Sequence, residues 1–306
     1  MGPAELSWLW MPITIGAAFA QTLRNAAQRH LTASLGTLGA TLVRFLYGLP
    51  FAVLWLALVC GYSGAALPGA GASFLLWVSF GAVLQIIATA LLLRVMADRN
   101  FALGVAYSKT EVLQVAIFGL VLLGDPLALP TALAAAVATL GVVLISAPPG
   151  ERSLRLVAQG WTRRTALLGL ASGAGFALSA AGYRGAALAL GVPAVIAAAT
   201  TLLWAQALQT VFLGGWLLVR KLHVAVAVLR AWRVSLLAGF MGALASGLWF
   251  TAMAMQPVVY VRTLGLVELF FSYLVSRKLF RERLGWTERL GILLLTLGIA
   301  GIAWRR

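Results

Sequence analysis

Two acidic residues lie deep inside apolar segments of this chain, where an ionised side chain is costly. Glu111 stands in the stretch "GVAYSKTEVLQV", residues 104–115, and Glu268 lies in a second apolar segment. A charge at the centre of a membrane-spanning helix costs roughly 2.5–3.5 kcal/mol on insertion scales. Both carboxylates should therefore face a cavity or a partner on another helix, where they could take up and release protons.

Two interpretations of these glutamates are open. In the first, they fix helix packing through embedded basic partners, for which the candidates are Arg24, Arg44, Lys109 and Arg262. In the second, Glu111 and Glu268 couple transport to protons, because at least one holds a proton at neutral pH and releases it as substrate binds. Glu111 is favoured for this role, since Tyr107 and Gln114 share its helical face.

Embedded basic residues outnumber the two glutamates, which suits a substrate carrying a carboxylate or a phosphate. They are Arg24, Arg44, Lys109, Arg184 and Arg262. Lys109 is the deepest of them, and we expect it to contact the anion; those near helix ends could instead extend to the lipid headgroups. The other side chains that we expect to bind substrate are Tyr107, Gln114, Gln21, Asn25, Arg24, Gln85, Thr89, Ser246, Trp249, Tyr260 and Tyr183.

The composition indicates which elements hold these residues. The 306 residues are 62% hydrophobic and 10% charged, which leaves too few charges to cover a soluble protein. Apolar runs of about 20 residues recur without the period-two alternation of a membrane β-barrel, so the chain is expected to be an all-α integral membrane protein. Ten spanning helices are predicted, at 7–28, 34–60, 72–97, 101–123, 127–147, 165–189, 193–219, 232–255, 258–280 and 285–304.

The charge pattern bears on partners and on orientation. The net charge is +15, but the basic residues cluster between apolar runs, so nucleic acid is not expected as a partner. Most of them lie in odd-numbered connections, which by the positive-inside rule places both termini outside. The single cysteine, Cys60, excludes an internal disulfide and a cysteine-based metal site, and no metal or cofactor is expected.

The two halves of the chain are related by a fixed offset of 157 residues. Glu111 corresponds to Glu268, and Thr139-Leu140-Gly141 corresponds to Thr296-Leu297-Gly298. We therefore divide the chain into a five-helix repeat at 1–147, a connecting loop at 148–164 and a second five-helix repeat at 165–306. Because five is odd, the second copy enters the membrane from the opposite side, an inverted-topology arrangement typical of secondary transporters with a midplane substrate site.

The chain resembles the EamA-type branch of the drug/metabolite transporter superfamily over nearly its whole length. The residues that carry this resemblance are the two five-helix units, the acidic turns "LLGDPL" (122–127) and "LFRERL" (279–284), the closing helices "ATLGVVLISA" and "LTLGIAGIAW", and Arg44 in "ATLVRFLYG". The resemblance implies a ten-helix basket around a central cavity, export of small metabolites or amino acids, and exchange against protons. The family is usually drawn with both termini inside, contrary to the charge rule. Asp125, followed by Pro126, is predicted to cap the next helix.

These observations predict a secondary active transporter in a bacterial-type cytoplasmic (inner) membrane, multi-pass and plausibly monomeric. Its expected partners are a small amino-acid-like or carboxylated metabolite, protons and membrane lipid, with proton-coupled export as the expected direction. Two alternatives stay open: an efflux pump for lipophilic drugs, and a non-transporting membrane assembly subunit. An enzyme is not expected, because the sequence has no paired histidines and no serine with a plausible base.

Overall fold

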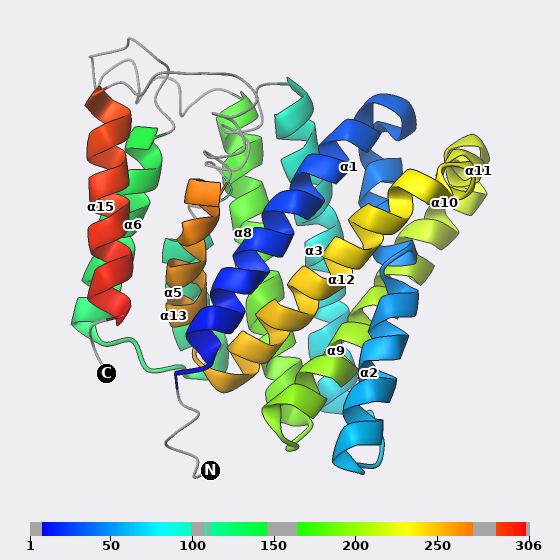
Figure 1. Cartoon of the computed structure of the whole chain (residues 1–306), viewed down its shortest axis with the longest axis horizontal. Helices are drawn as coiled ribbons and strands as arrows, with labels where there is room; N and C mark the ends of the chain where they lie inside the picture. The colour runs from blue at the N-terminus through cyan, green and yellow to red at the C-terminus, as the bar shows by residue number, and fades with distance from the viewer. Residues whose placement is uncertain (1–7, 99–107, 109–110, 146–163, 272–285, 304–306) are drawn as a thin grey trace.

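The computed structural model describes residues 8–98, 108, 111–145, 164–271 and 286–303, and every regular element in these ranges is a helix (Figure 1). The α-helices are α1 (Trp10–Leu46), α2 (Leu49–Ser63), α3 (Ala72–Asp98), α5 (Glu111–Leu123), α6 (Leu129–Ile145), α8 (Arg164–Ala189), α9 (Ala194–Gln209), α10 (Gly215–Arg220), α11 (Leu222–Arg230), α12 (Trp232–Met255), α13 (Val258–Leu264) and α15 (Trp286–Ala303). A π-helix, η1 (Thr210–Gly214), joins α9 to α10, and a 3-10 turn, η2 (Gly265–Val267), follows α13.

The surface of the molecule is apolar to an extent that is unusual for a soluble protein. Four helical segments are long and apolar enough to cross a membrane, namely Trp10–Ser63, Ala72–Ala97, Ala194–Arg220 and Trp232–Met255. Large apolar side chains such as Leu76 and Val121 are exposed on the outside, whereas Glu111 and Glu268 are buried. Such a surface is unfavourable in water and suits lipid. The prediction of an all-helical, membrane-embedded protein is confirmed at this level.

The break between the first two predicted segments lies at Gly36, later than the predicted connection at 29–33. Gly36 has φ 67° and ψ 174°, a left-handed φ that glycine adopts without strain. The side-chain amide of Gln28 donates a hydrogen bond to the carbonyl of Ala40 at 2.8 Å. This contact brings the two sides of Gly36 together, so α1 consists of two helices that run back along each other, as Figure 1 shows.

The connection predicted between 219 and 232 contains a helix, α11, which the sequence analysis missed. Its nine residues are too few to span a bilayer, so no long apolar run marks it. Non-helical backbone at Lys221 and Ala231 separates it from α10 and α12. Ala225 and Val228 are buried on its inner face, and the hydroxyl of Tyr47 donates to the Val228 carbonyl at 3.0 Å.

Close helix contacts build the interior around the charged residues. The most extensive ones join α1 to α12, α3 to α8, and α6 to α15. Small residues stand where these helices cross: a Cβ added to Gly182 would lie 3.1 Å from Gly81 of α3, and one added to Gly141 would lie 2.5 Å from the Leu295 nitrogen. Small residues of this kind let helices approach closely in lipid. The same packing brings residues of both halves of the chain to one central cavity.

Candidate functional site

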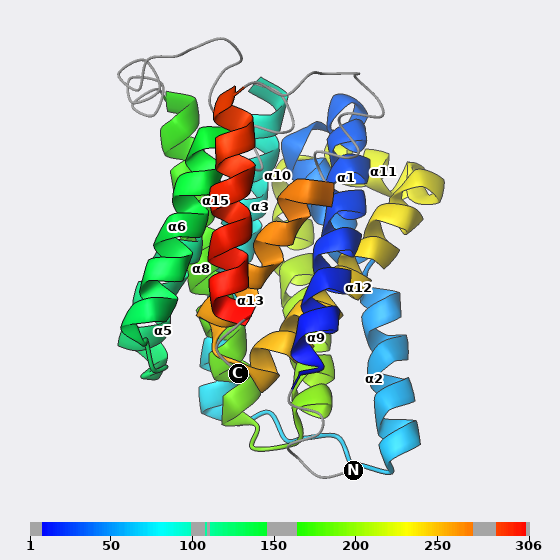
Figure 2. The ribbon, with the colours of Figure 1, turned by 60° about the vertical axis from the view of Figure 1, so that its left-hand side comes forward.

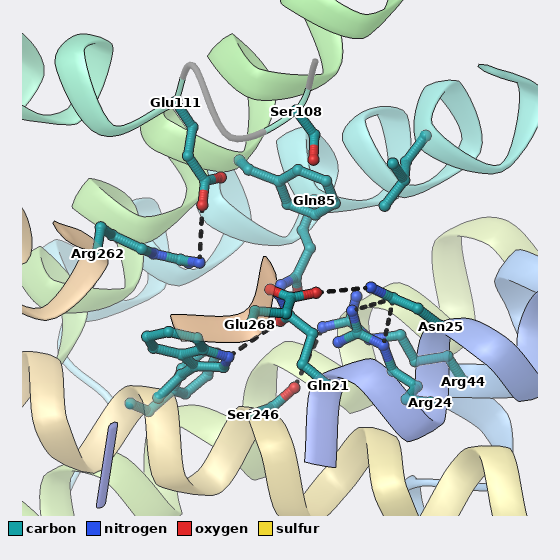
Figure 3. A pocket seen from close by; sticks show the side chains of 14 residues that line it. Gln21, Arg24, Asn25, Arg44, Gln85, Ser108, Glu111, Ser246, Arg262 and Glu268 are labelled. Carbon is teal, nitrogen blue, oxygen red and sulfur yellow. Dashed lines mark hydrogen bonds and ion pairs between the residues drawn. The ribbon is translucent and has the colours of Figure 1, made fainter. Parts of the chain in front are cut away.

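A polar cavity lies between α1, α3, α5, α8, α12 and α13, and Figure 3 shows it from close by. Its polar and aromatic lining residues are Gln21, Arg24, Asn25, Arg44, Gln85, Ser108, Glu111, Ser246, Trp249, Arg262 and Glu268. The free volume is about 20 Å³, room for one or two water molecules. Side chains therefore fill most of the space, and a larger ligand requires them to move.

Amide groups of α1 hold the carboxylate of Glu268, which is fully buried. Gln21 Nε2 donates to Oε2 at 2.6 Å, and Asn25 Nδ2 donates to Oε1 at 3.0 Å. Gln21 and Asn25 are four residues apart, so one helical face presents both amides. The indole Nε1 of Trp249 in turn donates to Gln21 Oε1 at 3.0 Å, which fixes the direction of that amide.

The guanidinium of Arg24 extends this cluster and is only partly satisfied. Its Nη2 and Nε donate to Asn25 Oδ1 at 2.7 Å and 3.3 Å. Its Nη1 is buried and has no hydrogen-bond partner among the residues that the structure describes. An unmade hydrogen bond at a buried charged group is costly, so Nη1 is a donor available to a ligand.

Arg44 is the cation with the weakest compensation. It is 3% exposed, and its Nη1 and Nη2 donate to the hydroxyls of Thr89 at 3.3 Å and Ser246 at 3.2 Å. Within the described part of the chain it forms no ion pair with an acid. Arginine keeps its charge in proteins, and a buried charge without a counter-charge is unfavourable. Among the described residues, Arg44 is therefore a cation of the cavity that an anionic ligand would compensate.

A third arginine closes the opposite wall. Arg262 Nη1 lies 3.3 Å from Glu111 Oε1 in a buried ion pair, and its guanidinium carbon lies 4.7 Å from the ring centroid of Trp249. Its Nε has no hydrogen-bond partner in the described ranges. The described lining thus holds three arginines and two glutamates, a net charge of +1 when all are ionised, which matches a monoanion.

A hydrogen-bonded network lies directly behind this lining. The hydroxyl of Tyr183 donates to Gln85 Oε1 at 2.9 Å. Gln209 Nε2 donates to Gln85 Oε1 at 2.6 Å and to the Tyr183 oxygen at 2.8 Å. The ring of Tyr183 packs on that of Phe250, with centroids 4.4 Å apart. These contacts fix the side chain of Gln85, the member of the network that reaches the cavity.

The structure brings most of the predicted site residues together. Those that line the cavity are Gln21, Arg24, Asn25, Gln85, Glu111, Ser246, Trp249 and Glu268. Thr89 and Tyr183 lie one hydrogen bond behind it. The described lining does not include Gln114, which is half-buried, or Tyr260, whose hydroxyl lies 3.3 Å from that of Thr131. Lys109 and Tyr107 lie outside the described residues.

One expectation about a charged residue was wrong. Asp125 does not cap α6, which begins at Leu129; its carboxylate forms an ion pair with Arg184 at 2.9 Å. Arg184 also donates to the carbonyls of Met253 and Gln256, and it does not contribute to the described cavity lining. It is therefore a satisfied structural cation that links α8 to the turn before α6 and to the end of α12.

Three residues that line the cavity, Arg44, Arg262 and Ser108, were not among the predicted site residues. Both arginines stand inside apolar runs, and the sequence suggested them as partners for the glutamates and as part of the embedded positive charge, but not as individual substrate contacts. What distinguishes them is visible only in three dimensions: one has hydroxyl partners alone, and the other pairs with a glutamate across the cavity. Ser108 is a polar residue among many and carries no signal in the sequence.

Comparisons with known proteins bear on the fold alone. No protein-family model matches the sequence, and no curated protein gives a significant match. Solved structures do share the fold: one described only as "Crystal structure of protein" has a TM-score of 0.66, with 15% identity, over 95% of this chain and 94% of that chain. The fold and the cavity together define an all-helical, membrane-embedded protein with a charged interior cavity.

Proposed function

We propose that the protein is a secondary active transporter that exports a small carboxylated or amino-acid-like metabolite across a bacterial-type cytoplasmic membrane, coupled to protons. The observation that carries this proposal is the buried cavity in which Arg44 has no counter-charge among the described residues. A purely structural polar core would be expected to neutralise such a charge, because an uncompensated one destabilises the fold. In a cavity that binds an anion, the ligand itself would compensate the charge of Arg44.

Helix packing supports the proposal of two inverted five-helix repeats, the ten-helix EamA-type arrangement that the sequence resembles. At the offset of 157 residues, the part of α1 before Gly36 corresponds to α8, and α3 corresponds to α12. The contact of α1 with α12 then has its counterpart in the contact of α8 with α3, and both are among the most extensive in the molecule. This pairing is expected if the first helix of each repeat packs on the third helix of the other repeat.

Individual contacts follow the same relation. Gly141 packs against Leu295, and Gly298 packs against Ala138. Gly141 and Gly298 are counterparts at the offset of 157, and so are Ala138 and Leu295. Chance similarity in an alanine- and leucine-rich chain would not predict reciprocal contacts.

Residues of the cavity are also related by the offset of 157. Thr89 and Ser246, the two hydroxyls that hold Arg44, are counterparts at the same offset, as are the lining glutamates Glu111 and Glu268. Arg44 has no basic counterpart, since Thr201 stands at the equivalent position. The interface between two such copies is where secondary transporters hold a substrate.

The chemistry of the lining suggests how binding and proton transfer are linked. A carboxylate entering the cavity would find Arg44, together with the unused donors of Arg24 and Arg262, within one lining. Charge-assisted hydrogen bonds of this type are stronger than hydrogen bonds between neutral groups. Protonation of Glu111 would remove its ion pair with Arg262, which joins α5 to α13, and leave that contact free to open. Uptake of a proton would thereby release one wall of the cavity.

One observation favours the alternative of lipophilic drug efflux. An apolar pocket of about 230 Å³ lies between α2 and α12, lined by residues such as Phe51, Trp55 and Phe240. It has almost no polar lining and lies apart from the arginines, so it would hold an uncharged or lipophilic compound. A lipid chain would fit it equally well, and the charged cavity remains the stronger indication.

Transport by the purified chain in liposomes tests the proposal. Labelled amino acids, monocarboxylates, phosphorylated metabolites and lipophilic cations are screened for uptake with and without a pH gradient, beside protein-free liposomes. We expect an anionic or zwitterionic metabolite to move in response to the gradient. Movement of lipophilic cations alone would favour the efflux alternative, and no movement of any compound by folded protein would favour a non-transporting subunit.

A further inference from the structure

One end of the helix bundle carries an amphipathic helix that lies across its neighbours. α11 is seen nearly end-on in Figure 1 and from the side in Figure 2, beyond the ends of α10 and α12. Together with the tip of α1 it forms an open groove of about 720 Å³. Its walls include Ser34, Leu35, Leu222, His223, Val226 and Arg230. We refer to α11 with the flanking Arg220, Lys221 and Arg233 as the α11 platform.

The α11 platform carries an uncompensated positive charge. Arg220, Lys221, Arg230 and Arg233 are all exposed. The acidic side chains that the structure describes are Glu111, Asp125 and Glu268, and every one of them is buried elsewhere. None of the four basic residues therefore has an acidic partner among these three described side chains. A surface of this kind attracts phosphate-bearing groups.

Apolar side chains stand among these charges. Leu222 is 59% exposed, Leu229 57% and Trp232 49%, and the guanidinium of Arg233 lies 5.4 Å from the ring centroid of Trp232. A short helix with basic residues, exposed leucines and a flanking tryptophan is typical of the membrane–water interface. Here it lies at the end of helices that are themselves apolar enough to cross the membrane.

The helix is held firmly in place, so the surface is preformed. The hydroxyl of Tyr47 donates to the carbonyls of Val228 at 3.0 Å and Leu229 at 3.3 Å, near the C-terminal end of α11. On the inner face, a Cβ added to Gly39 would lie 3.1 Å from Val224. These contacts anchor α11 on α1, and they leave the groove and the basic residues facing outward.

We propose that the α11 platform is a binding site for acidic phospholipid. The headgroup phosphate lies beside Arg230, the basic residue of the groove lining, and Lys221 and Arg233 add to the positive potential around it; an acyl chain follows Val226 and Leu222 along the groove. Zwitterionic lipid has the same acyl chains but no net negative charge, so the site distinguishes the two by charge. Attraction of this type contributes about fivefold in affinity for each basic side chain near an anionic headgroup.

The test is the thermal unfolding of the full chain in neutral detergent. It is measured with added phosphatidylglycerol, with phosphatidylcholine of the same acyl chains, or with inorganic phosphate. We expect phosphatidylglycerol alone to raise the melting temperature of the wild type. In the variant Lys221→Gln/Arg230→Gln/Arg233→Gln the apparent affinity for phosphatidylglycerol should fall by roughly 100-fold. Arg230→Gln alone should lose about fivefold, and Arg94→Gln, an exposed arginine of α3, should lose nothing.

Four results would overturn the proposal. Equal stabilisation by both lipids would mean that only the acyl chains are bound. Equal stabilisation by inorganic phosphate would mean a site for a free anion. Unchanged affinity in the triple variant, or the same loss in Arg94→Gln, would place the lipid elsewhere. Because the substituted residues are exposed, the variants are expected to fold, which their melting temperatures without lipid establish.

Discussion

Replacement of Arg44 by methionine should separate stability from substrate binding. Arg44 is 3% exposed, and its two hydroxyl partners at 3.3 Å and 3.2 Å lie at the long end of the hydrogen-bond range. Replacing a buried ion pair by apolar side chains of similar volume is often neutral or stabilising by about 1–4 kcal/mol, and Arg44 lacks even the attraction of such a pair among the described residues. We therefore expect Arg44→Met to unfold at the same temperature as the wild type or at a higher one.

The same substitution should weaken substrate binding strongly. Truncating one partner of a buried, hydrogen-bonded charge pair costs about 2–5 kcal/mol, or roughly 30- to 4,000-fold in Kd. The two measurements are thermal unfolding of the purified protein and equilibrium binding of the labelled carboxylate found in the transport screen. Loss of affinity without loss of stability is the expected signature of a residue kept for its ligand.

Arg262→Met is the matched control, because Arg262 pairs with Glu111 inside the protein. Removing it leaves a buried carboxylate without this cation, so stability should fall by about 3–5 kcal/mol. The double variant Arg262→Met/Glu111→Gln should recover most of that loss. If Arg44→Met instead loses several kcal/mol of stability and binds substrate as the wild type does, Arg44 is a structural residue and the argument from its missing counter-charge is refuted.

Three further predictions concern the proton, the Asp125 ion pair and helix packing. Glu111→Gln should lose accumulation driven by a pH gradient in liposomes while retaining substrate exchange; accumulation at the wild-type level would contradict proton coupling through this residue. Asp125→Asn should lower the free energy of unfolding by about 3–5 kcal/mol, because it leaves Arg184 buried without its anion, yet transport per folded molecule should be unchanged. Gly141→Ala should cost about 1–3 kcal/mol in chemical denaturation, since its Cβ would lie 2.5 Å from the Leu295 nitrogen; Gly61→Ala, with no atom within 4 Å, is the control and should be tolerated.

The sequence indicated the lining of the cavity where a single residue carries a strong physical signal. Glu268 in an apolar run had to find partners, and Gln21 and Asn25, spaced by one helical turn, supply them. The helical class was equally accessible, because backbone hydrogen bonds in lipid must be made within the segment. These inferences need only the cost of burying a charge or a peptide group.

The remaining features depend on tertiary structure and could not be predicted. Asp125 pairs with Arg184, 59 residues away, whereas the local pattern with Pro126 suggested a helix cap. Arg44 is distinguished by its partners Thr89 and Ser246, which come from different helices. α11 is too short to show as an apolar run and owes its position to contacts with Tyr47 and Gly39. In each case the partner or the position of the feature depends on residues that are distant in the sequence.

The central claim is that the cavity between the two halves opens to water and receives an anion. Cysteine accessibility tests it most directly: Ser246→Cys is introduced into a Cys60→Ser background, with Ser172→Cys as the control because Ser172 is buried and bonded to the Ala88 carbonyl outside the cavity. We predict that a membrane-impermeant thiol reagent modifies the cysteine at 246, that transported substrate slows the reaction, and that the cysteine at 172 does not react. A cysteine at 246 that stays unreactive from both sides of the membrane would contradict the account, because the charged residues would then form a dry core.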